Sequence, residues 1–115
     1  MKLFTDKELF QWEKDRYVFL ELSDGEVSPS CVQFYNRKSS TGPEVTISEG
    51  KAKIPDYLLM DCLPIMALAC TGEPGSTKVV TRREFKVIKR VRPESYSEDS
   101  EDQFYDIIYD GGEES

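Results

Sequence analysis

The chain has 115 residues, of which 22 are acidic, 15 are basic and none is histidine. This length suits one domain of ordinary size. The lack of histidine excludes a Ser-His-Asp or Cys-His catalytic couple, a histidine metal ligand and an imidazole pH switch. The three cysteines, Cys31, Cys62 and Cys70, form no CxxC pair and are odd in number, so we expect neither a zinc site nor a disulfide framework but buried, reduced thiols.

The net charge of −7 is unevenly distributed along the chain. Residues 1–93 hold all 15 basic side chains and 13 acidic ones, whereas residues 94–115 hold nine acidic side chains and no basic one. A segment of this composition has little apolar surface to bury. We therefore predict one domain over residues 1–96 and a flexible acidic tail over residues 97–115.

The sequence carries no pattern of a membrane or secreted protein. No apolar run approaches the roughly 18 residues that span a bilayer. The first seven residues, MKLFTDK, reach a carboxylate and a second lysine before an apolar stretch begins, unlike a signal peptide. We expect a cytoplasmic protein without a membrane partner.

Taken in chain order, the first part of the sequence predicts short strands. Three segments have extended, apolar or alternating patterns: 7–12, Tyr17–Leu22 and Cys31–Asn36. The first is a candidate edge strand, and the second ends at a Ser23-Asp24-Gly25 turn. Farther on, Val45–Ser48 and Lys51–Ile54 flank Glu49-Gly50 and predict a tight hairpin.

The second part predicts one helical turn and two longer strands. Pro55–Met60 begins with proline and aspartate, which favours a single turn of helix. The apolar run Pro64–Cys70 predicts a strand buried on both faces. Lys78–Arg90 predicts the longest strand, and Arg92-Pro93 ends it. Its candidate core residues are Val80, Phe85, Val87 and Ile88.

Six or seven short strands with turns every eight to twelve residues, and no long helical period, indicate an all-β fold. This pattern is typical of an antiparallel β-sandwich.

Six cationic side chains follow one another closely in the last predicted strand and just after it: Arg82, Arg83, Lys86, Lys89, Arg90 and Arg92. We call this set the basic segment. It is open to three interpretations: a nucleic-acid contact, the charged solvent face of an edge strand, or a surface on which the acidic tail docks, within or between subunits. The net acidity of the chain argues against nucleic acid.

The acidic tail contains five large apolar or aromatic residues in six positions: Phe104, Tyr105, Ile107, Ile108 and Tyr109. A tail that only keeps the protein in solution does not need them. They favour a linear docking element that binds a partner as a helix in a groove or as an added strand. Packing onto the chain's own domain, or onto a neighbouring molecule in a crystal, is the alternative.

No residue pattern points to catalysis, a metal or a cofactor. The acidic residues of the domain are scattered over turns and polar strand faces, without the paired carboxylates that general acid–base catalysis needs. The glycines form no phosphate-binding pattern, and Asp24-Gly25 and Asp110-Gly111 supply no calcium loop. We expect a protein that is not an enzyme and has no catalytic or metal-binding residue.

Three stretches together resemble a known family: Val32–Asn36, Lys53–Ile65 and Phe85–Tyr96, the last containing Arg92-Pro93 and Tyr96. Residues 12–96 are similar to the immunoglobulin-like N-terminal domain of minor structural, tail- or baseplate-associated proteins of phages and prophages of Gram-positive bacteria. The resemblance implies an immunoglobulin-like β-sandwich and a structural role through protein–protein contacts, with other virion proteins or further copies of the chain as partners. It also implies residence in the host cytoplasm during assembly and then in the virion.

A function from another class stays open. The chain would then be a small regulatory binding module whose acidic tail docks on a basic surface of its partner.

Overall fold

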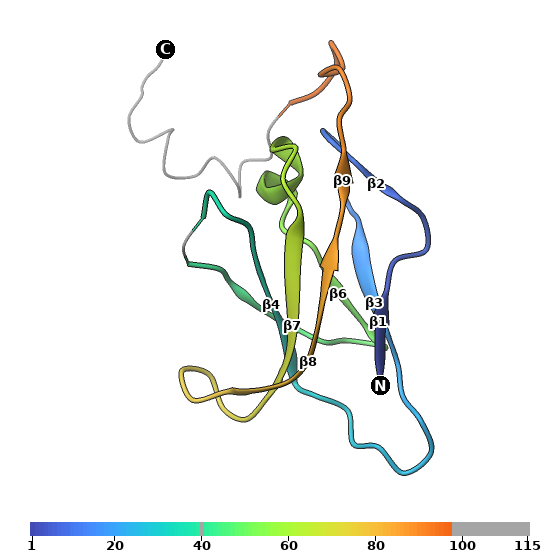
Figure 1. Cartoon of the computed structure of the whole chain (residues 1–115), viewed down its shortest axis with the longest axis vertical. Coiled ribbons are helices and arrows are strands. Elements are labelled where there is room, and N and C mark those ends of the chain that lie inside the picture. The colour runs from blue at the N-terminus through green and yellow to red at the C-terminus, as the bar shows by residue number, and fades with distance from the viewer. Residues whose placement is uncertain (40, 98–115) are drawn as a thin grey trace.

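The computed structural model describes residues 1–39 and 41–97, and its elements make an all-β protein, as predicted (Figure 1). The strands are β1 (Lys2–Phe4), β2 (Leu9–Phe10), β3 (Tyr17–Glu21), β4 (Cys31–Tyr35), β5 (Glu44–Thr46), β6 (Lys51–Lys53), β7 (Ile65–Thr71), β8 (Lys78–Phe85) and β9 (Val87–Ile88). The one helix in this part of the chain is the 3₁₀ turn η1 (Asp56–Met60). The tail residues from 98 onward, which include the docking element predicted at Phe104–Tyr109, lie outside the described residues.

The strands form three sheets. Two are antiparallel, with strand orders β1-β3-β6 and β5-β4-β7-β8, and the third is the short parallel pair β2-β9. The N-terminal segment therefore pairs first with β3 and then, after Phe4, changes partner and runs beside β9. Because β9 follows β8 after one residue, this change of partner places the start of the chain next to its last strands.

One hydrophobic core draws on all three sheets. Its largest fully buried side chains come from both antiparallel sheets, from η1 and from β2: Val18, Val32, Phe34, Ile65, Leu58, Leu59 and Leu9, with Ile54 beside them. Each such side chain contributes about 1.5–3 kcal/mol through removal of apolar surface from water. Since the core crosses the sheet boundaries, the described β elements pack as one body.

Two local predictions are confirmed. The segment that begins at Pro55 forms η1, and Pro55 immediately precedes its first residue. The Ser23–Gly25 turn is closed by the Glu26 N–H, which donates to the Ser23 carbonyl oxygen at 3.1 Å, and Gly25 has φ of +83°. Glycine suits that backbone conformation because it has no Cβ.

The predicted hairpin between residues 45 and 54 is wrong. β5 pairs with β4, and β6 pairs with β3 in the other antiparallel sheet; only a single bridge joins Ser48 to Lys51. The physical reason lies in the apolar partners. Val45 stands opposite Val32, and Ala52 stands opposite Val18, so the two strands complete two different sheets around the shared core.

Three predictions of burial need correction. Val80 is 48 % exposed because it lies beside a register irregularity near the start of β8, whereas Phe85 and Val87 are buried as predicted. Cys62 is exposed, because it lies in the connection from η1 to β7 and not in a strand. The strand over residues 65–71 buries one face fully, while Met66 and Leu68 on the other face are half-buried.

Candidate interaction surface

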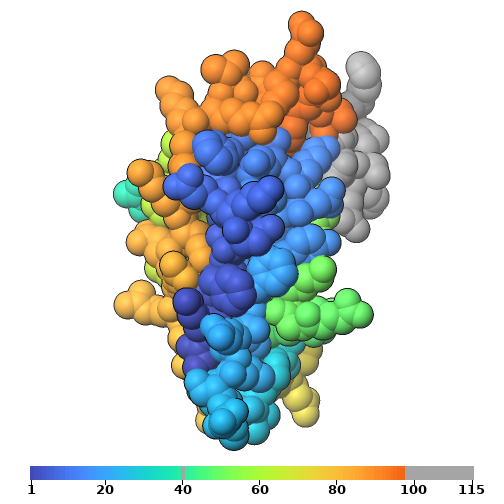
Figure 2. Space-filling model, turned by 90° about the vertical axis from the view of Figure 1, so that its right-hand side faces the viewer, coloured from blue at the N-terminus to red at the C-terminus, as the bar shows by residue number. Residues whose placement is uncertain are grey.

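Strand β8 lies at the edge of the four-stranded sheet. Its antiparallel partner is β7, and no other strand of residues 1–39 and 41–97 pairs with its second side. Figure 2 shows the N-terminal residues in blue beside the side chains of β8 and β9 in orange, and β1 contacts β8 across this boundary. A long strand with an unpaired edge offers backbone N–H and C=O groups to an incoming strand.

The exposed apolar side chains at this edge come from the first half of β8. Val79, which follows Lys78, is 53 % exposed, and the next residue, Val80, is 48 % exposed. Native proteins commonly protect such edges with charge and with irregular register. Here Lys78 and the irregularity between β7 and β8 at Ala69/Cys70 give partial protection, while the two valines stay accessible.

The basic segment does not form a single surface, because neighbouring side chains of a strand point to opposite faces. Arg82 stands opposite Leu68, on the outer face of the sheet. Arg83 stands opposite Ala67, on the core side, where its Nη1 donates to the Leu3 carbonyl oxygen at 2.7 Å. Its guanidinium also lies 5.2 Å from the Phe85 ring centre. Arg83 therefore ties β8 to β1, and Arg82 is the cation of this pair that faces outward.

The other four cations lie farther along the chain, and the side chains of all four are exposed. Lys86 separates β8 from β9, and Lys89 follows β9. Arg90 holds its place through its backbone: its N–H meets the Gln11 side-chain oxygen at 3.2 Å, and its carbonyl oxygen accepts from the Trp12 indole at 3.0 Å. The cationic side chains of the basic segment are thus spread over two faces of β8, the residue between β8 and β9, and the chain that follows β9.

A cation–aromatic cluster, made of Trp12, Lys14, Arg92 and Tyr96, fixes the end of the described chain. The Trp12 and Tyr96 rings meet edge to face with centres 5.3 Å apart. The Arg92 guanidinium lies 5.2 Å from the Trp12 ring and 5.4 Å from the Tyr96 ring, and Lys14 Nζ lies 4.9 Å from Tyr96. Such contacts contribute about 0.5–1 kcal/mol each at exposed sites.

Sequence reasoning missed the part that Trp12 and Lys14 take in this cluster. The available signal was the single tryptophan of the chain together with the Arg92-Pro93 and Tyr96 motif, because a large ring near one end of a domain needs a packing partner. The structure gives the motif a physical role: it holds the residues after β9 against the β2–β3 connection.

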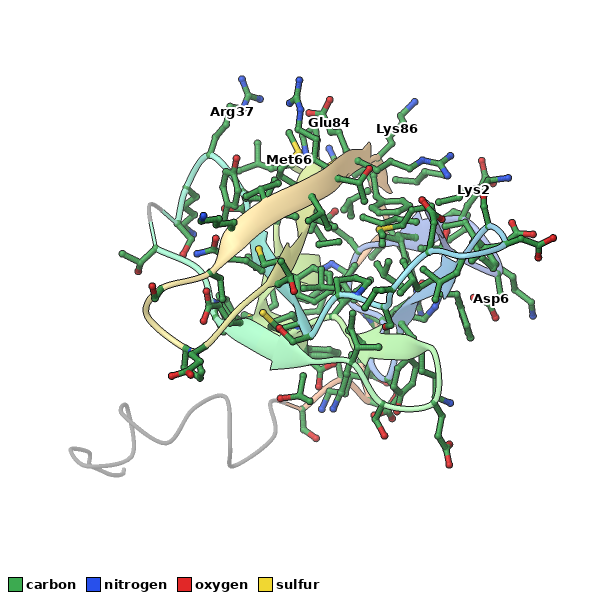
Figure 3. All side chains as sticks on the ribbon, turned by 90° about the horizontal axis from the view of Figure 1, so that it is seen from below. Lys2, Asp6, Arg37, Met66, Glu84 and Lys86 are labelled. Atoms are coloured by element: carbon green, nitrogen blue, oxygen red, sulfur yellow. The ribbon has the colours of Figure 1, made fainter. Side chains whose placement is uncertain are left out.

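The outer face of the four-stranded sheet carries a second set of accessible groups. The register aligns Tyr35, Met66 and Glu84 in one row and Gln33, Leu68 and Arg82 in the next. In Figure 3 the side chains of Met66, Glu84 and Lys86 project to the same side of the molecule. Tyr35, Met66 and Leu68 are half-buried, so this face combines apolar area with charges from the edge strand.

The buried carboxylate Asp56 serves the fold. The Asp15 backbone N–H donates to its Oδ1 at 3.3 Å, and Lys53 Nζ lies 3.9 Å from its Oδ2. Burial lowers the pKa of Lys53, but the carboxylates of Asp56 and Asp15 outweigh it, and the net pKa is raised. The lysine therefore stays charged beside its two acids, an arrangement that anchors the start of η1 to the β2–β3 connection.

The described residues contain small open clefts. One of about 170 Å³ lies where the N-terminal segment changes partner, between Thr5, Glu8, Arg83 and Lys86. A second, of about 260 Å³, is lined by Cys31 and Glu44, and a third, of about 330 Å³, by Lys38 and Tyr57. Within residues 1–39 and 41–97, no three His, Cys, Asp or Glu side chains are grouped so that they could hold a metal ion.

A search of the helical segments among these residues finds none that is long and apolar enough to cross a membrane. Comparison of the chain with protein-family models, with curated proteins and with solved structures finds no match.

Proposed function

We propose that this chain is a non-enzymatic structural protein of a phage or prophage, placed in the tail or baseplate, which works through protein–protein contacts. In this proposal it resides in the host cytoplasm during assembly and then in the virion. The observation that carries the proposal is the unpaired edge of β8 with its exposed Val79 and Val80. Such an edge suits assembly by strand pairing.

The same proposal includes an immunoglobulin-like sandwich as the fold. In immunoglobulin domains one sheet contains strands A, B and E, and the other contains C, F and G, with C′ added in some members. The orders β1-β3-β6 and β5-β4-β7-β8 correspond to A-B-E and C′-C-F-G. The N-terminal segment, which pairs with β3 and then with β9, links the first and last strands. These correspondences support the fold that the resemblance implies.

The contact residues that we propose are Val79, Val80 and Arg82. The two valines supply exposed apolar area at the edge. Arg82 supplies a cation on the outer face beside half-buried Leu68. A partner strand with apolar and acidic side chains would complement this combination, because opposite charges on directly facing strands stabilise a sheet.

The test compares virion incorporation of three versions of the full chain during phage assembly. Val80→Lys adds a charge to the open edge, and Val27→Lys makes the same change at a loop valine that is 84 % exposed. We expect the wild-type chain and Val27→Lys in gradient-purified virions. We expect Val80→Lys to be depleted about tenfold, which corresponds to about 1.4 kcal/mol of contact free energy. Absence of the wild-type chain from virions would overturn the proposal.

The second candidate, a regulatory module with an acidic docking tail, is favoured by one sequence observation: residues 94–115 hold nine acids and no basic residue. Binding of that kind is strongly screened by salt, whereas a contact through backbone pairing and apolar burial is much less so. The salt dependence of partner binding therefore distinguishes the two functions.

A further inference from the structure

Two buried cysteines face one another in the four-stranded sheet. Cys31 begins β4, Cys70 lies near the end of β7, and the register makes them direct partners. Side chains of such partners lie on the same face of the sheet. Their Cα atoms are about 4.5–5.5 Å apart in antiparallel pairs, inside the range of about 4.4–6.8 Å that disulfides need. Both are free thiols in the structure, and their register is the one at which a disulfide can join two antiparallel strands.

The two thiols differ in access. Cys31 is 8 % exposed and lines the cleft of about 260 Å³ together with Ser30, Glu44 and Thr77. Cys70 is 1 % exposed and lies behind it. Burial, with a smaller contribution from neighbouring Cys31, raises the pKa of the Cys70 thiol. A small solute in the cleft therefore reaches Cys31 first, and the raised pKa of Cys70 disfavours the thiolate form of the deeper thiol.

The turn between β7 and β8 shapes this cleft. Gly72 and Pro74 from the turn line it, and Thr77 donates its hydroxyl to the Glu44 carboxylate of β5 at 2.7 Å. Ser30 reaches the other side and donates to the Gly72 carbonyl oxygen at 3.2 Å. The cleft, of about 260 Å³, has room for a small oxidant such as hydrogen peroxide beside Cys31.

We propose that Cys31 and Cys70 are an oxidation site, in which a small peroxide converts the pair into a cross-strand disulfide with Cys31 as the first sulfur to react. The Cys31 thiol loses its proton, and the thiolate attacks one peroxide oxygen as the O–O bond breaks. A sulfenic acid forms, and the leaving hydroxide takes up the released proton to give one water. The Cys70 sulfur then attacks the Cys31 sulfur. The S–O bond breaks as the S–S bond forms, and the Cys70 proton leaves with hydroxide as a second water. One hydrogen peroxide is reduced to two waters, and two thiols are oxidised to one disulfide.

The consequence is a covalent link between the two central strands of the sheet. It closes a loop of about 40 residues. A cross-link over a long loop stabilises the folded state more than one over a short loop, because it lowers the conformational entropy of the unfolded chain by a larger amount. Neither cysteine belongs to β8, although Cys70 stands opposite Val79, and the oxidation does not involve the unpaired side of that strand. The inference therefore does not depend on the proposed function, and each fails by its own experiment.

The experiment uses the full chain with Cys62→Ser, which removes the exposed thiol and keeps both buried ones. After treatment with hydrogen peroxide we expect the intact mass to fall by about 2 Da. Neither cysteine should then react with a thiol reagent, even after the protein is denatured. Peptide mapping should join Cys31 to Cys70, a reductant should reverse the change, and the Tm should rise. This readout needs no substitution at either cysteine of the pair.

Two further variants test the order of reaction. Dimedone should label Cys31 in Cys70→Ser, and it should leave Cys70 unlabelled in Cys31→Ser, with circular dichroism used to check that each variant is folded. A gain of oxygen mass without a cross-link, two thiols that stay free under peroxide, or preferential labelling of Cys70 would each overturn the proposal.

Discussion

Strands β8 and β9 are one stretch of chain with two different environments. β9 is covered: β2 pairs with it, and the Gln11 N–H extends the pairing by donating to the Ile88 carbonyl oxygen at 2.9 Å. β8, one residue earlier, has an unpaired side and exposes Val79 and Val80. Cations lie within β8 and directly on either side of β9, at Lys86 and Lys89, so charge alone does not reveal which half is built into the domain.

The difference between β8 and β9 indicates that the two strands have different roles. The partner change of the N-terminal chain after β1 covers β9, fills the core with Leu9 and Val87, and leaves β8 open. We infer that the covered half contributes mainly to stability and the open half mainly to contacts. Three experiments test that comparison.

Leu9→Ala should have the largest effect on stability. Leu9 is 1 % exposed and stands opposite Val87, so its loss leaves a cavity between β2 and β9. We expect the free energy of unfolding to fall by about 3 kcal/mol, in the range of buried leucine truncations. Urea denaturation measures it, with Val80→Ala as the control from the open half, where a change within about 0.5 kcal/mol is expected. Equal losses in both variants would contradict the division between the two halves.

Arg83→Ala and Arg82→Ala form the second comparison. Arg83 donates to the Leu3 carbonyl oxygen and stacks on Phe85, so its removal loosens β1 from β8. A hydrogen bond from a charged group contributes more to stability than one between neutral groups, but solvent weakens it here because Arg83 is exposed. We therefore expect the free energy of unfolding of Arg83→Ala to fall by about 1 kcal/mol. Arg82→Ala should change stability by less than about 0.5 kcal/mol. Chemical denaturation of the two variants measures their free energies of unfolding. A larger loss of stability in Arg82→Ala than in Arg83→Ala would contradict the assignment of Arg83 as the residue that ties β8 to β1.

The all-β class, the strands at Tyr17–Glu21 and Cys31–Tyr35 and the turn of helix at η1 could be predicted because they depend on local patterns: alternation, apolar runs and proline. The pairing could not. Glu49-Gly50 has the residues of a hairpin turn, yet Val45 and Ala52 pair with strands of different sheets. This pairing depends on how the two sheets pack around the core, which the local sequence does not specify. Val80 was misassigned for a similar reason, since the irregularity beside it arises from pairing with β7.

The cations of the candidate surface were predicted from the sequence, but its exposed valines and its geometry were not. A run of cations in a strand indicates an edge, and the edge position of β8 agrees with that interpretation. Which of Arg82 and Arg83 faces outward depends on the register with β7, and the sequence does not contain that register. The contact between Trp12 and Tyr96 joins residues at opposite ends of the domain, so no local pattern could specify it.

The smallest expected change in stability comes from truncation of the chain after Tyr96. The cut removes eight acids and no base, which changes the formal net charge from −7 to +1, while it keeps the Trp12–Tyr96 contact. We expect the free energy of unfolding to change by less than about 0.5 kcal/mol, because the described core lies before the cut. Urea denaturation of the full and truncated chains measures this change, and light scattering at low and high salt compares their oligomeric states.

If the acidic tail is attracted to the basic segment, within or between subunits, the full chain should change its oligomeric state or compactness with salt, and the truncated chain should not, since salt screens exposed charges. Arg82→Glu in the full chain reverses the charge of the cation that lies on the outer face of β8. It should weaken the salt response, whereas Lys89→Glu, beyond the covered half, should weaken it less if docking is centred on β8. Identical salt behaviour of the full and truncated chains would show that the tail does not dock on the basic segment.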